Sequence, residues 1–188
     1  MGAPRILDVY NRPTRQKSDC SCGPASFSLV AAALGLGEIP ETSWWDGAHA
    51  RWLRVEELPS RGMALHEAAT ALELTLGERA EISSHRAFPE NKTLLERHLL
   101  LATTQPNLAL IANFAQDPLL DRNEHPQGNP HYSPVAAYDR ANRRALIADV
   151  DADVKEAYWA TLDALFDAMA FQNPAYRLPR GWLLVRKR

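Results

Sequence analysis

This chain has few cysteines, little net charge and no long hydrophobic run. Among its 188 residues only two are cysteines, Cys20 and Cys22, and one residue separates them. Two cysteines so close together cannot build a disulfide framework, and a four-ligand zinc site would need additional His or carboxylate ligands. We therefore expect reduced thiols, as in a cytoplasmic protein, and no built-in metal site.

The sequence gives no indication of a membrane or a nucleic acid as a partner. No stretch approaches the roughly 18 consecutive apolar residues that span a bilayer. Residues 1–11 contain charged side chains and no apolar run of signal-peptide length. A formal net charge of −2 gives no reason to expect binding to nucleic acid or to an anionic membrane. We expect one globular domain spanning residues 1–188, and whether it forms a homodimer stays open.

The spacing of apolar residues predicts helices in the first half of the chain and mainly strands in the second. Residues 25–34 have helical spacing, with Pro24 suited to the first turn and Gly35 to the end of the helix. Because this helix is largely apolar, we expect it in the core, and we expect the same of Trp44, Trp45 and Trp52. Further predictions are helices at 64–76, 93–101 and 157–169, strands at 108–114, 131–138, 145–150 and 181–185, and a hairpin turn at 139–144. Helices followed by strands indicate an α+β fold.

Cys22 is the strongest candidate for a reactive group. It stands where the chain enters the buried helix, and Gly23 and Pro24 follow it directly. A helix N-terminus offers unpaired N–H groups and a positive partial charge, which both favour the nucleophilic thiolate. A buried cysteine of purely structural role is the competing interpretation.

A cysteine nucleophile needs a base and a group that orients the base. We favour His131 as the base because it lies between a polar loop and the start of a strand. The other histidines lie in predicted loops or helices: His49, His66, His85, His98 and His125. Across the predicted hairpin, Asp149 falls within about three residues of the position opposite His131 and is the natural orienting acid. Asp151 and Asp153 have the same parity and stay open as alternatives.

Acyl transfer also requires hydrogen-bond donors for the developing oxyanion. Gln16 lies six residues before Cys22, and the segment between them is polar. Its side-chain amide and the backbone N–H of Cys22 could together provide these donors.

These residues lie in motifs that resemble those of the papain-like catalytic domain of phytochelatin synthases. That family has a Gln six residues before a Cys-Gly-[Leu/Pro]-Ala-[Ser/Thr] helix start, a His-Phe-Ser-Pro strand and a Leu-Asp-Val strand end. The corresponding segments here are Gln16 with Cys22-Gly23-Pro24-Ala25-Ser26, His131-Tyr132-Ser133-Pro134 and Ala148-Asp149-Val150. Further matches are Trp159, Ala168-Met169 and Arg180-Gly181-Trp182-Leu183-Leu184, with weaker ones at Arg51-Trp52 and Arg61-Gly62-Met63. The resemblance extends over residues 13–186.

The resemblance implies a papain-like α+β fold with Cys22 as nucleophile, His131 as base and acid, Asp149 as orienting residue and Gln16 as oxyanion donor. The implied reaction cleaves glutathione at its Cys–Gly bond. The resulting γ-glutamylcysteinyl thioester then passes to water or to a second thiol peptide. Zinc or cadmium would arrive with the thiol substrate, and no cofactor is implied.

The segment after Asp149 departs from the family pattern. The family has Val-Ala-Arg-Phe-Lys-Tyr-Pro-Pro-His-Trp at the position of residues 150–159. In this chain Ala152 replaces the Arg, acids are added and the prolines are absent. The composition of this segment predicts a helix. A substrate carboxylate without its Arg partner would lose about 1.5–3 kcal/mol. Pro130 also replaces the Gly that precedes the family's His. Two alternatives therefore stay open: a papain-like acyltransferase or amidase in a biosynthetic pathway, and a non-catalytic binding module.

Overall fold

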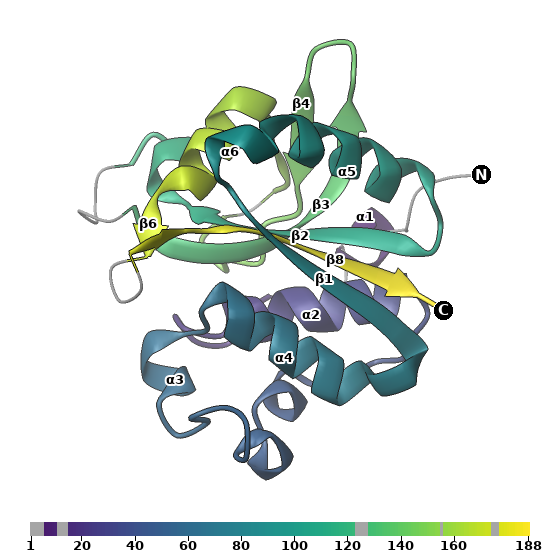
Figure 1. The fold of residues 1–188 in the computed structure, drawn as a ribbon, viewed down its shortest axis with the longest axis vertical. Helices are drawn as coiled ribbons and strands as arrows, with labels where there is room; N and C mark the ends of the chain where they lie inside the picture. The colour runs from purple at the N-terminus through teal and green to yellow at the C-terminus, as the bar shows by residue number, and fades with distance from the viewer. Residues whose placement is uncertain (1–5, 11–14, 123–127, 155, 174–176) are drawn as a thin grey trace.

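A six-stranded antiparallel sheet forms the middle layer of the molecule (Figure 1). The computed structural model describes residues 6–10, 15–122, 128–154, 156–173 and 177–188. Along the sheet the strands follow the order β1 (Ala80–Arg86), β8 (Gly181–Lys187), β2 (Leu108–Ala115), β3 (Pro130–Asp139), β4 (Arg144–Ile147) and β5 (Tyr158–Thr161). The short strands β6 (Gln172–Asn173) and β7 (Leu178–Pro179) pair separately.

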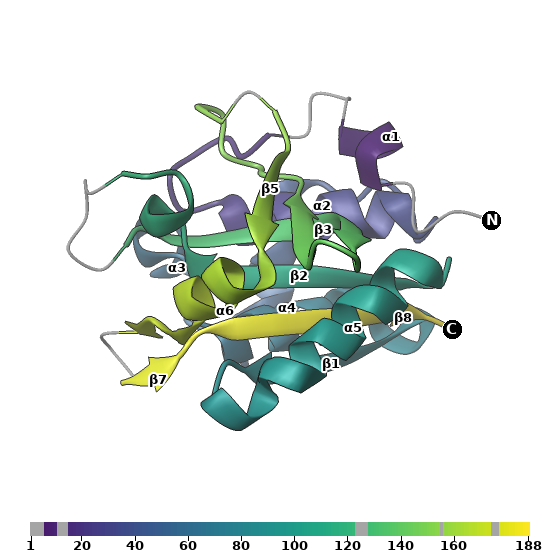
Figure 2. The ribbon, with the colours of Figure 1, turned by 90° about the horizontal axis from the view of Figure 1, so that it is seen from above.

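Helices cover both faces of the sheet (Figures 1 and 2). On one face lie α1 (Ile6–Tyr10), α2 (Cys22–Ala33), α3 (Leu58–Arg61) and α4 (Leu65–Leu76), and on the other lie α5 (Lys92–Thr104) and α6 (Leu162–Ala170). Short 3-10 turns connect these elements at Glu41–Trp44, Gly47–His49, Gly77–Arg79, Pro89–Asn91 and Asp117–Leu119. The predicted α+β architecture, with a buried nucleophile helix packed on an antiparallel sheet, is confirmed.

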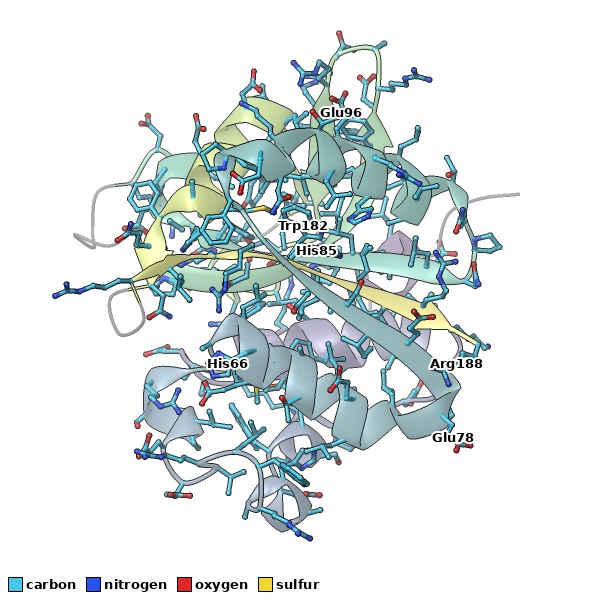
Figure 3. All side chains as sticks on the ribbon, viewed as in Figure 1. His66, Glu78, His85, Glu96, Trp182 and Arg188 are labelled. Carbon is cyan, nitrogen blue, oxygen red and sulfur yellow. The ribbon has the colours of Figure 1, made fainter. Side chains whose placement is uncertain are left out.

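Each face of the sheet has its own hydrophobic core. The core around α2 includes the fully buried Phe27 and Trp44, whose rings meet edge to face at 5.4 Å. On the opposite face, under α5, Trp182 stacks on His85 with ring centroids 5.3 Å apart (Figure 3). The expectation of core tryptophans is confirmed for Trp44 but wrong for Trp52, which is 63% exposed.

Most predicted elements are found close to their expected bounds. The helices predicted at 25–34 and 93–101 correspond to α2 and α5, and the predicted hairpin is formed by β3 and β4. The helix predicted at 157–169 is wrong in its first turn, because residues 158–161 form the edge strand β5 paired with β4. The helix begins at Leu162, where Thr161 caps it by accepting a hydrogen bond from the backbone N–H of Ala164 at 3.1 Å. Strand β1 was not predicted at all.

The expectation of helix in residues 150–159 is also wrong. After Asp149 the chain makes consecutive turns, in which Asp149 accepts from the N–H of Asp151 at 3.0 Å and Asp151 accepts from the N–H of Asp153 at 2.9 Å. Aspartate side chains that bond the backbone two residues on compete with helix formation. Residues 149–153 therefore form a loop and not a helix.

No helix in the described part of the chain has the length and apolar character needed to cross a membrane.

Candidate active site

Cys22 is the first residue of α2 and is 6% exposed. The residue before it, Ser21, does not cap the helix with its side chain. Its hydroxyl instead closes the preceding turn by accepting from the backbone N–H groups of Lys17 and Ser18, at 3.0 and 3.1 Å. In the first turn of α2 the N–H of Ala25 donates to the carbonyl of Ser21 at 2.9 Å and Pro24 has no N–H, so the backbone donors nearest the sulfur are those of Cys22 and Gly23.

His131 and Asp149 meet because β3 and β4 form a hairpin. The register pairs Val135 with Ile147, and the backbone N–H of Ala148 donates to the carbonyl of Pro134 at 2.9 Å. Continuing this register places Asp149 opposite Ser133. His131 lies two residues before Ser133, so its side chain is on the same face of β3 and next to that of Ser133. The His131 Nε2 atom lies 2.7 Å from Asp149 Oδ1, so the acid predicted first is the one in contact, in preference to Asp151 and Asp153.

His131 also reaches the cysteine. Its side chain is hydrogen bonded to that of Cys22. Because Nε2 faces Asp149, the second ring nitrogen, Nδ1, is the one left for the sulfur. Cys22 from the helical layer and His131 from the sheet therefore meet across the interface between the two layers.

Asp149 is fully buried and is held by several donors. Its Oδ1 accepts from His131, from the N–H of Asp151 and, at 3.3 Å, from the hydroxyl of Ser133. Its Oδ2 accepts from Tyr158 OH at 3.0 Å and from Gln116 Nε2 at 3.2 Å. Such a carboxylate has little freedom to rotate away from the imidazole.

The two buried groups stabilise each other's charge. Burial by itself would lower the pKa of His131, but the Asp149 carboxylate and the contact with Cys22 raise it to about 10. Burial would raise the pKa of Asp149, but the charge and hydrogen bonds of its neighbours, His131 foremost, lower it to about 2. The imidazolium and the carboxylate thus form a buried ion pair beside Cys22.

Cys20 has a different environment. It is half-buried in the turn before α2, and burial together with the nearby Cys22 raises the pKa of its thiol. A raised pKa leaves less of the Cys20 thiolate at neutral pH.

Gln16 is half-buried beside the same site. Its backbone N–H donates to the carbonyl of Val150 at 2.9 Å, which joins the segment before Cys22 to the segment after Asp149. Its side-chain oxygen Oε1 is buried with no hydrogen-bond partner among the described residues. The neighbouring Arg15 donates to the carbonyls of Asp149 and Asp151, which strengthens the same connection.

A groove of 730 Å³ lies next to the site. One wall is the turn between α3 and α4, where Gly62 approaches the backbone of Cys20, and another part is Pro130, which precedes His131. Arg61 stabilises this turn by a two-pronged ion pair with the buried Glu67, at 2.7 and 2.9 Å. The exposed Trp52 also lines the groove. So does His66, which lies at the start of α4 (Figure 3).

Among the described residues no group of three or more His, Cys, Asp or Glu side chains is arranged to hold a metal ion. Of the other histidines, His49 bonds Asp46 and Thr75, while His85 and His98 pack with Trp182, away from Cys22. His125 lies outside the described residues.

The sequence did not point to Gln116, Ser133 or Tyr158, although all contact Asp149. Ser133 could have been found from the hairpin, because it shares a strand face with His131. Gln116 and Tyr158 reach the site only through the pairing of β2 with β3 and of β5 with β4.

Comparison with known proteins bears on the family and the fold of this chain. A family model described as phytochelatin synthase matches residues 4–182. Glutathione gamma-glutamylcysteinyltransferase 1 of Triticum aestivum is 28% identical over 184 residues, and the second such enzyme of Arabidopsis thaliana is 24% identical over 182 residues. Each alignment covers 92% of this chain but only 34% and 37% of the respective relative, so the chain spans about a third of their length.

Two solved structures share the fold. The peptidase domain of Streptococcus ComA gives a TM-score of 0.54 at 15% identity, covering 93% of this chain and 96% of that domain. A C39-like peptidase from Bacillus anthracis gives 0.59 at 11% identity, covering 100% and 98%. Both are peptidases by name, and the likeness establishes a papain-like fold for this chain.

Proposed function

Because this chain belongs to the phytochelatin synthase family, we propose that it cleaves glutathione-like thiol peptides at the Cys–Gly bond through a γ-glutamylcysteinyl thioester on Cys22. The observation that carries this proposal is the contact of Cys22 with the buried His131–Asp149 pair at the start of α2. The relatives' printed names describe transfer of the same acyl group.

In the first half of the reaction, the Cys22 sulfur attacks the carbonyl carbon of the scissile peptide bond. His131 holds the proton that the thiol has given up, and Asp149 stabilises the resulting imidazolium. Negative charge develops on the carbonyl oxygen, where the N–H of Cys22 and the side-chain amide of Gln16 act as donors. The C–N bond then breaks as His131 returns its proton to the leaving glycine nitrogen.

The second half releases the acyl group. Water, or the amino group of a second thiol peptide, attacks the thioester, and His131 takes the proton of the attacking group. The thiolate of Cys22 leaves and the free enzyme is restored. Any zinc or cadmium belongs to the thiol substrate in this scheme, and no resident cofactor takes part.

The groove lined by Trp52 and the α3–α4 turn is the proposed binding cleft for the peptide. It has the size of a small-ligand site and lies next to both Cys20 and Pro130. We further propose that the enzyme works in the cytoplasm, where a reducing environment keeps Cys22 as a thiol, and its state as monomer or homodimer is left to measurement.

A second candidate keeps the same chemistry on a different acyl group. It is favoured by Ala152, which stands where the family has an Arg, and by the neighbouring Asp151 and Asp153. In this case the chain makes or breaks an amide bond in a biosynthetic pathway, with a substrate that lacks the γ-glutamyl carboxylate.

The deciding experiment is incubation with glutathione, without metal and with zinc or cadmium, and detection of free glycine by mass spectrometry. We expect glycine release that Cys22→Ser abolishes and the matched variant Cys20→Ser retains. No release under any of these conditions would exclude glutathione as the substrate. If Cys22 is nevertheless alkylated rapidly by iodoacetamide in a manner that depends on His131, the second candidate gains support. If it is not, the chain is a binding module.

A further inference from the structure

Gln116 is a completely buried polar residue directly after β2. Its side chain contacts two acids of the segment that follows β4, Asp149 and Asp151. Its Nε2 atom lies 3.2 Å from Asp149 Oδ2 and 3.2 Å from Asp151 Oδ2. One amide group therefore donates to two carboxylates that are two residues apart. Neither the resemblance nor the sequence pattern assigns a role to this residue.

The orientation of the Gln116 amide is set by a partner on its other side. Asn129 Nδ2 donates to Gln116 Oε1 at 3.1 Å, so the oxygen of the amide is occupied and its nitrogen faces the acids. Carboxylates accept hydrogen bonds and cannot donate them, which excludes the opposite orientation. The backbone repeats the connection, since the N–H of Gln116 donates to the carbonyl of Asn129 at 3.0 Å.

Asn129 lies two residues before His131, so Gln116 is connected to both members of the buried pair. The local backbone is built for this contact. Asn129 has a φ of 48°, and Gly128 has a φ of 72° and approaches Ala115 so closely that a Cβ atom would lie 2.6 Å from the Ala115 Cβ. A side chain at residue 128 would therefore push the loop away from Gln116.

The acids at 149 and 151 create an electrostatic problem that Gln116 relieves. The buried Asp149 and the half-buried Asp151 approach the same amide nitrogen, and like charges so placed repel each other. The other groups that face Asp149 are His131, Ser133 and Tyr158, and Tyr10 and Arg15 lie close by. Gln116 donates to both acids through its side chain, and it does so without adding charge.

We propose that Gln116 is a positioning residue of this active site, which keeps Asp149 directed at His131 and separates its charge from that of Asp151. Gln116 touches neither the substrate nor the sulfur and acts through Asp149. The inference rests on the proposed function, but the alkylation readout of its test does not require that the acyl group be identified.

The test compares Gln116→Leu, Gln116→Glu and Gln116→Leu/Asp151→Asn, with Gln105→Leu as control. Gln105 also carries a side-chain amide, but it lies at the end of α5, where its oxygen accepts a hydrogen bond from Arg186. The substitution Gln105→Leu should therefore leave the rate unchanged. Two readouts are measured against pH: the rate of Cys22 alkylation by iodoacetamide, and kcat and KM for glycine release.

For Gln116→Leu we expect kcat to fall about 10- to 100-fold with KM little changed, as for loss of a hydrogen bond to a charged group. The acidic limb of the profile should move to higher pH, because the two carboxylates lose their common donor. Adding Asp151→Asn should restore most of the rate. Gln116→Glu keeps the shape, and its activity should rise as the pH is lowered and the introduced carboxyl gains a proton to donate.

A loss that is independent of pH and is not restored by Asp151→Asn would mean that Gln116 only supports the fold, and would overturn the inference. Wild-type profiles for both single variants would overturn it as well. If Gln116→Leu does not fold, the pH dependence of Gln116→Glu decides the question. If Cys22→Ser leaves glycine release intact, the proposed function is wrong. If Cys22→Ser abolishes glycine release but the Gln116 variants behave like the wild type, only the role inferred for Gln116 is wrong.

Discussion

The two sides of the active site are built in different ways. On the helical side, Cys22 is positioned by backbone: the start of α2 and the turn that Ser21 closes. On the sheet side, Asp149 is positioned by side chains from separate strands and loops, namely His131, Ser133, Tyr158 and Gln116. The sulfur has to form and break bonds, while the carboxylate has to stay where it is. We therefore expect changes near the sulfur to remove chemistry and changes around Asp149 to alter rate and pH dependence by degrees.

The largest effect is expected where the two sides meet. In His131→Ala the sulfur loses its proton acceptor and the positive charge beside it, so glycine release should fall by about 10⁴-fold. The alkylation rate of Cys22 at neutral pH should fall with it. Equal alkylation of the variant and the wild type would show that the two side chains are not coupled.

Asp149→Asn should reduce kcat by about 10³-fold and also change the pH profile. The pKa of His131 is raised to about 10, chiefly by Asp149 working against burial, so the imidazolium is present below that pH and is lost as the pH rises through it. Without the carboxylate, burial dominates and the pKa of His131 falls. The alkaline limb of Cys22 alkylation should therefore move to lower pH by more than about one unit. A limb that stays in place contradicts the role given to Asp149.

Gln16→Ala tests the oxyanion donor on the helical side. Removal of one such donor typically costs about 10²- to 10³-fold in kcat with little change in KM. Alkylation of Cys22 should remain fast, because iodoacetamide forms no oxyanion. A rise in KM at constant kcat would assign Gln16 to substrate binding instead.

Tyr158→Phe removes one donor to Asp149 Oδ2 and leaves Gln116 in place. Burial and the nearby carboxylate raise the pKa of Tyr158, so its hydroxyl is protonated and donates. We expect a decrease in kcat of about 10-fold, the lower end for a hydrogen bond to a charged group, because Gln116 still donates to the same oxygen. A loss as large as that of Asp149→Asn would mean that Tyr158 takes part in the chemistry directly.

The smallest effect is expected for Cys20→Ser. Cys20 lies in the turn before α2, and the raised pKa of its thiol disfavours a role as nucleophile. Steady-state glycine release should remain within about twofold of the wild-type rate. A large decrease would instead indicate that Cys20 meets the thiol substrate in the groove.

The sequence was informative where the structural signal is local. The start of α2 follows from Gly23 and Pro24, and the contact of His131 with Asp149 follows from a hairpin whose register leaves an error of only a few residues. The contact of Gln116 with Asp149 was not predictable, because it joins residues 33 positions apart in the chain. It depends on which strands become neighbours in the sheet.

The segment after Asp149 was predicted incorrectly for a related reason. Its composition suits a helix, but Asp149 and Asp151 bond backbone N–H groups further along and turn the chain. Ala152 differs from the family residue, yet the backbone still forms a loop there.

The central claim is that an acyl group becomes attached to Cys22, and the most direct test is intact-protein and peptide mass spectrometry after rapid acid quenching with glutathione. The account predicts a γ-glutamylcysteinyl adduct on the peptide that contains Cys22, present in the wild type and absent from Cys22→Ser. Because Cys20 and Cys22 fall on the same peptide, fragmentation must assign the adduct to one sulfur, with Cys20→Ser as the matched control. An adduct on Cys20, or glycine release that persists in Cys22→Ser, would contradict the account.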